Sequence, residues 1–144
     1  MFQKLWRKLA WGFTPPSRKK RLLDDALSLL DTFGETHDLL ALARAEGVTI
    51  SISGKMIGDG ANGHFGIGLD GRKFIELAPR RKPEELASTL IHELRHVWQA
   101  KVMGMFEANA PSKDDNGAEF MTLATRVREA DAFACTAAVI QQMN

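Results

Sequence analysis

The stretch Thr89–Gln99 reads TLIHELRHVWQ, and it decides the fold because it forms the centre of a long predicted helix. Apolar residues recur around it at steps of three and four, which is typical of a helix with one apolar face. The pattern runs from Pro83, a residue suited to a first helical turn, to about Met103. The recurring positions are Leu86, Leu90, Leu94 and Val97.

His92, Glu93 and His96 form an HExxH pattern on this helix. Residues four apart differ by only about 40° around a helix axis, so both imidazoles can bind one metal ion. Their positions lie away from the apolar stripe. The chain has only 4 histidines, so chance is a poor explanation for the pattern. We therefore predict that His92 and His96 bind Zn²⁺ and that Glu93 is the general base that activates a water molecule.

A third metal ligand is expected on a later alanine-rich helix, predicted over residues 118–142. Glu129 is the first choice, since a glutamate from a helix downstream of HExxH completes a His₂Glu site. Helical phase instead favours Asp131, which lies nearer the apolar stripe that we expect to face inward. Asp131 is therefore kept as an alternative ligand or as a carboxylate that orients a histidine, and Glu119 also stays open. The stripe consists of Phe120, Leu123, Val127, Ala134 and Ala138.

The stretch Thr89–Gln99 resembles the active-site helix of small bacterial zincins of the gluzincin type, which include uncharacterised metallopeptidases. The resemblance covers about residues 45–140. It implies a zincin-like minimal metallopeptidase fold, in which a short sheet precedes the HExxH helix. It also implies a later helix with a Glu-x-x-Ala pattern that supplies the third ligand, here Glu129 and Ala132. The chain departs from the thermolysin-like pattern at Phe133, where that pattern has an aspartate.

The rest of the chain predicts short elements around this helix. A helical pattern over 18–45, interrupted near Gly34, indicates two short helices or one kinked helix. Asp70-Gly71 is a strong hairpin turn, and the polar, glycine- and proline-containing residues 104–116 predict a loop over the site. The expected strands are residues 48–53, 64–69 and 73–77. The predicted fold class is α+β, with a small, mainly antiparallel three-stranded sheet, the HExxH helix and a C-terminal helix across it.

The N-terminus differs in character from the remainder. Residues 1–21 contain seven basic residues and no acid, although the whole chain has a net charge of +1. Apolar residues at helical spacing and a Pro15-Pro16 hinge make residues 1–17 a basic amphipathic arm, followed by one zincin-like domain over 18–144. The arm could bind an anionic membrane surface, a partner protein or its own domain. Charge without readout chemistry gives no reason to expect specific nucleic-acid binding.

No stretch approaches the roughly 20 apolar residues of a membrane span, and the N-terminus lacks the apolar centre of a secretory signal. The expectation is therefore a cytoplasmic protein, peripheral at the membrane if the arm binds there. The single Cys135 excludes an internal disulfide and a multi-cysteine zinc site.

The predicted function is zinc-dependent hydrolysis of peptide bonds in a peptide or protein substrate. The alternative is a non-catalytic zincin-like module, in which the metal stabilises the fold and the basic arm binds a partner or a membrane surface. The intact Glu93 favours the enzyme. The chain has no tyrosine to stabilise an oxyanion, and spacing singles out none of the other donors. Those donors are His37, His64, Arg126 and Arg128.

Overall fold

The computed structural model describes residues 17–53, 61–104 and 115–144, with only the backbone of 115–122. Three predicted features lie outside the described residues: positions 1–16 of the arm predicted over 1–17, most of the loop predicted over 104–116, and the side chain of Glu119. The described part contains four helices and one sheet. In chain order these are α2 (Arg18–Asp31), α3 (Gly34–Ala45), β1 (Thr49–Ile52), β2 (Gly63–Ile67), β3 (Lys73–Leu77), α4 (Pro83–Met103) and α5 (Asp115–Met143).

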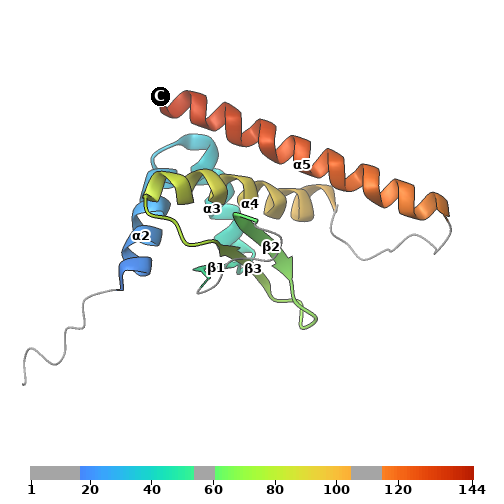
Figure 1. Ribbon diagram of the computed structural model, residues 1–144, viewed down its shortest axis with the longest axis horizontal. Helices are drawn as coiled ribbons and strands as arrows, with labels where there is room; N and C mark the ends of the chain where they lie inside the picture. Colours follow the sequence, from blue (N-terminus) through green and yellow to red (C-terminus); the bar gives the residue numbers. More distant parts are fainter. Residues whose placement is uncertain (1–16, 54–60, 105–114) are drawn as a thin grey trace, which may run out of the picture.

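Helix α4 is the central element of the fold, with α5 lying across one side of it and the sheet on another (Figure 1). It covers the predicted residues Pro83–Met103, because its ends carry strong local signals. Pro83 stands in the first turn with Glu84 and Glu85, whose charges favour a helix N-terminus. Gly104 ends the helix in the left-handed region at φ 64°. The stripe Leu86, Leu90, Leu94 and Val97 is fully buried, as predicted.

The sheet has the strand order β1-β3-β2 and is mixed. β2 and β3 are antiparallel, as the Asp70-Gly71 turn predicts, but β1 pairs with β3 in parallel. The expectation of a mainly antiparallel sheet was therefore wrong. A turn signal reports only the pairing of its two flanking strands, whereas the chain crosses from β1 to the far edge of the sheet before turning back. Strand order depends on that long-range contact, which no local pattern encodes.

The two faces of the sheet differ. Phe65 of β2 stands opposite Ile75 of β3, and both are buried, as is Leu77. Side chains alternate along a strand, so His64 and its partner Glu76 lie on the other face. The buried face belongs to the same hydrophobic core as Leu90 and Leu94 of α4. The sheet therefore supports the HExxH helix directly.

The predicted interruption near Gly34 separates two helices, α2 and α3. Thr36 is fully buried at this corner, and its hydroxyl donates to the carbonyl oxygen of Leu30 at 2.6 Å. This bond reinforces the end of α2, where the same carbonyl oxygen also accepts from the backbone N–H of Phe33 at 3.4 Å. Both helices pack against α4.

Helix α5 corrects the predicted apolar stripe. Leu123 and Val127 are 60% and 51% exposed, and Ala134 and Ala138 are exposed too. Ala132 and Val139 are the buried positions of the described side chains on this helix. The prediction failed because the packed face of α5 also carries polar groups that contact α4, so hydrophobicity alone selected the wrong face.

None of the described helices is long and apolar enough to cross a membrane.

Candidate metal centre

His92 and His96 come from successive turns of α4, as their spacing predicts. Their Nε2 atoms are 3.1 Å apart, and their rings meet edge to face. His96 is 6% exposed and His92 is half-buried. Burial lowers the pKa of His92, and the neighbouring His96 lowers it further, while the Glu129 carboxylate opposes both effects. The neutral imidazole is the form that binds metal ions.

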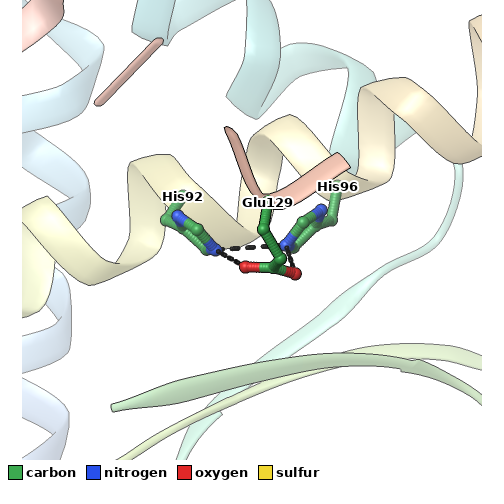
Figure 2. Close-up of side chains that lie close together, drawn as sticks. All are labelled: His92, His96 and Glu129. Carbon is green, nitrogen blue, oxygen red and sulfur yellow. Dashed lines mark hydrogen bonds and ion pairs between the residues drawn. The ribbon is translucent and has the colours of Figure 1, made fainter. Parts of the chain in front are cut away.

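Glu129 reaches the two histidines from α5. One carboxylate oxygen lies 3.1 Å from Nε2 of His92, and the other lies 3.1 Å from Nε2 of His96. Figure 2 shows the three side chains pointing toward one another, the two histidines from α4 and Glu129 from α5. Their ligand atoms all lie within 4.8 Å of one another, so the group could hold a metal ion.

The spacing of these atoms fits a zinc ion. Two nitrogen ligands at about 2.0–2.1 Å from a tetrahedral zinc are roughly 3.3 Å apart. The observed separation of the two Nε2 atoms, 3.1 Å, is close to that value. Two imidazoles and a carboxylate are also donors that zinc accepts readily. An ionised Glu129 carboxylate can accept hydrogen bonds but cannot donate them. A cation between the three groups would therefore relieve the repulsion between their acceptor atoms.

Glu93 lies beside this group and is 5% exposed. Burial raises the pKa of Glu93 to about 7; the backbone N–H of Phe65 lowers it and the Glu129 carboxylate raises it. Gly63 makes the close approach of β2 to Glu93 feasible. A Cβ atom at Gly63 would lie 2.8 Å from Oε1 of Glu93 and 2.7 Å from Cγ2 of Thr89. The carboxyl group is thus held between α4 and the edge of the sheet.

A cavity of about 640 Å³ opens onto the group. Its walls come from β2 and the segment before it, from α4 and from α5. His92, Glu93, His96 and Glu129 all line it, so the candidate ligands and the candidate base face the same space. Phe133, 65% exposed, stands at its edge with its ring 4.6 Å from that of His92.

Residues 8–144 match a family described as Putative metallopeptidase family (DUF6782). The chain belongs to this family. The family description agrees with the metallopeptidase expected from HExxH, and the match covers nearly the whole chain. No curated protein and no solved structure matches the chain significantly.

Within this family member, Asp131 lies outside the group of three. Its carboxylate accepts from Nε and from a terminal nitrogen of Arg95, at 2.7 and 3.1 Å. Arg95 also lies over the ring of Trp98, 3.9 Å from its centroid. The Arg95 guanidinium holds the pKa of Asp131 below its usual value, although burial opposes this.

Sequence reasoning missed Gln99, which is fully buried between α4 and α5. Its side-chain oxygen lies 2.8 Å from Nδ1 of His96, and its side-chain nitrogen donates to Asp131 at 2.8 Å. A signal was available, since a residue three positions after a helical histidine lies on the same side of the helix. It was overlooked because glutamine is not itself a metal ligand in this pattern. Gly63 was missed because a close approach depends on tertiary packing.

The four residues weighed as oxyanion donors are scattered. His37 of α3 pairs with Asp31 of α2 at 3.3 Å, and neither residue lines the cavity. Arg126 is exposed. His64 is among the residues that line the cavity, but its ring contacts Phe74 on the sheet face opposite Phe65. Arg128 lines the cavity. It directly precedes Glu129, so of the four residues it lies nearest in sequence to a candidate ligand of this metallopeptidase family member.

Proposed function

We propose that this chain is a zinc-dependent peptidase in which His92, His96 and Glu129 hold the metal and Glu93 is the general base. One observation carries the proposal. The ligand atoms of the three residues converge within 4.8 Å at the wall of a cavity that Glu93 also lines. Membership of a metallopeptidase family supports peptide-bond hydrolysis as the reaction at this site.

The residues of the chain divide the work of hydrolysis. A bound zinc ion would supply Lewis acidity to the substrate carbonyl and to the attacking water. Glu93 takes a proton from the water as the water oxygen attacks the carbonyl carbon. Glu93 then gives this proton to the amine that leaves. Burial raises the pKa of Glu93 toward the operating pH, where a general base works best, and a nearby zinc ion would favour the ionised form that accepts the proton.

The position of β2 supports a peptide as the substrate. Among the described strands β2 lies at an edge of the sheet, with β3 as its neighbour. Gly63, Phe65 and Glu93 line the same cavity, so an extended peptide lying along β2 would bring a peptide bond close to the base. Exposed strand edges bind extended peptides through main-chain hydrogen bonds.

A non-catalytic metal-stabilised module is the second candidate. The observation in its favour is that Glu129 and the two histidines belong to different helices, so a metal ion there would join α5 to α4. In that case the basic residues 1–21 would bind a partner protein or a membrane surface, and Glu93 would have no chemical role.

The experiment that separates the two candidates compares Glu93→Gln with the wild type. Both proteins are incubated with an unfolded protein mixture, with and without chelator, and new N-termini are identified. The peptidase proposal predicts cleavage by the wild type that stops with chelator and returns with zinc. Glu93→Gln should retain zinc but lose cleavage. Glu84→Gln, a change at an exposed position on the same helix, is the matched control and should remain active. Cleavage that persists in Glu93→Gln would contradict the proposal.

A further inference from the structure

Gln99 is a buried amide whose orientation its surroundings determine. It is 0% exposed, and its Nε2 atom lies 3.0 Å from the carbonyl oxygen of Arg128 and 2.8 Å from Oδ2 of Asp131. Both of these neighbours are acceptors only. If the amide were rotated by 180°, its oxygen would face two other oxygens, which is repulsive. The nitrogen of Gln99 must therefore point toward α5, and its oxygen must point toward His96.

This orientation determines which nitrogen of His96 carries the proton. Oε1 of Gln99 lies 2.8 Å from Nδ1 of His96 and can only accept a hydrogen bond. Nδ1 must then be the donor. In the neutral ring the lone pair is left on Nε2, which is the atom that faces His92 and Glu129.

We infer that Gln99 is a positioning residue that holds His96 in the Nδ1–H form, so that Nε2 faces the metal site as a ready ligand. The inference rests on the proposed role of His96 as a ligand. Gln99 does not line the cavity and contacts His96 on its Nδ1 side, so it acts through the imidazole. Partners of this kind typically contribute 10- to 100-fold to metal affinity, because they fix the ring and its tautomer before the metal binds.

The contacts of Gln99 also connect the ligand to the packing of the two helices. Asp131 accepts from Gln99 on one side and from Arg95 on the other, and Arg95 lies against Trp98. Gln99 and Arg95 belong to α4, whereas Asp131 and the Arg128 carbonyl belong to α5. The orientation of His96 therefore depends on α5 being in place. That helix also supplies Glu129, so docking of α5 prepares two of the three ligands together.

His92 provides an internal reference. Its Nδ1 atom is buried, and among the described residues it has no hydrogen-bond partner. Nothing described therefore fixes the tautomer of His92 from that side. A change at Gln99 should therefore alter the ring protonation of His96 directly, and that of His92 only indirectly, through the 3.1 Å contact between the two Nε2 atoms.

The test reads the histidine tautomers by nitrogen and carbon NMR in the full chain, metal-free and zinc-loaded, at a pH well above the ordinary His pKa of about 6.5. In the wild type, His96 should carry its proton on Nδ1 in both states. In Gln99→Met, which keeps length but removes the acceptor, the metal-free His96 should become a mixture of tautomers. Zinc affinity, measured by competition with a chelator, should fall about 10- to 100-fold. Gln141→Met, at an exposed position near the end of α5, should change neither quantity.

Two results would overturn the inference. One is a wild-type His96 that carries its proton on Nε2, and this measurement needs no variant. The other is a folded Gln99→Met protein with an unchanged His96 tautomer. If that variant does not fold, Asp131→Ala is informative, since it removes the Oδ2 atom that accepts from the amide of Gln99 and should weaken zinc binding by about fivefold. An unchanged zinc affinity in a folded Asp131→Ala protein would count against the inference. Because the tautomer is read without metal, it can be decided even if the wild type binds no zinc, which would refute the proposed function instead.

Discussion

Helices α4 and α5 build the candidate metal centre together, yet they are packed very differently. α4 is covered on several sides, and nine of its residues are buried, including Glu93, His96 and Gln99. Of the described side chains on α5, Ala132 and Val139 are buried, while Leu123, Val127 and Phe133 are more than half exposed. The tightly packed helix thus carries two candidate ligands and the candidate base, and the loosely packed helix carries the third candidate ligand. Metal binding and the docking of α5 should therefore depend on each other.

The largest expected effect concerns packing. Leu90→Ala removes a fully buried side chain from α4 and should lower the free energy of unfolding by about 2–5 kcal/mol. Val127→Ala on the exposed face of α5 should change it by less than about 0.5 kcal/mol. Urea denaturation of both variants checks the difference. A large loss in Val127→Ala would mean that the exposed face of α5 is covered in solution.

Zinc should stabilise α5 more than α4. At a free zinc concentration 100 times the Kd, binding adds about 2.7 kcal/mol to the stability of the state that binds the metal. Hydrogen exchange should then show that chelator lowers protection in α5 around Glu129, with a smaller change in the centre of α4. His96→Ala, measured in the same way, should not respond to chelator. Equal loss of protection in both helices would contradict the comparison.

On the sheet side of α4 the packing is tight, and a single methyl group should disturb the base. Gly63→Ala places a carbon atom against Glu93 and Thr89, so the carboxyl group must move. We expect kcat to fall about tenfold, equivalent to about 1.4 kcal/mol in the barrier, with zinc affinity retained. Gly34→Ala is the matched control, because its added carbon meets nothing within 4 Å. Normal turnover in Gly63→Ala would show that Glu93 is not held as described.

The smallest effect is an acid sensitivity at the far end of α4. Glu46 of the α3 end pairs with Lys73 of β3 and with Lys101 of α4, and its bond to Lys73 is the main reason why its pKa lies below 4.5. A carboxyl group with a lowered pKa in the folded state adds stability above its unfolded pKa. That stability is lost as the pH falls through the folded value. Glu46→Gln should therefore be less stable than the wild type at pH 7, and the two should converge as the pH falls and Glu46 becomes protonated. Thermal unfolding across this pH range tests it, and a constant difference would contradict it.

The elements that carry local signals could be predicted from the sequence. The bounds of α4 follow from Pro83, its acidic first turn and Gly104, and the histidines follow from helical spacing. The β2–β3 pairing follows from the turn at Asp70-Gly71, where Gly71 has φ 79°. The structure also brings Glu129 to the histidines, which the motif spacing favoured.

What depends on long-range contact was not predictable in the same way. The parallel pairing of β1 is decided by a crossover, and no residue in β1 encodes its neighbour. The packed face of α5 was misjudged because ligand and ion-pair contacts, from Glu129 and Asp131, outweigh the apolar stripe that includes Val127. The contact of Gln99 with Asp131 and that of Gly63 with Glu93 join residues far apart in sequence, so no local pattern encodes them.

The central claim is that His92, His96 and Glu129 hold one metal ion, and metal content tests it most directly. The wild type and His96→Ala are purified side by side, supplemented with zinc, desalted and analysed for metal per chain. The account predicts one zinc per wild-type chain and none in His96→Ala, with both proteins folded by circular dichroism. A folded wild-type protein that retains no zinc, or a His96→Ala protein that retains a full equivalent, would contradict it.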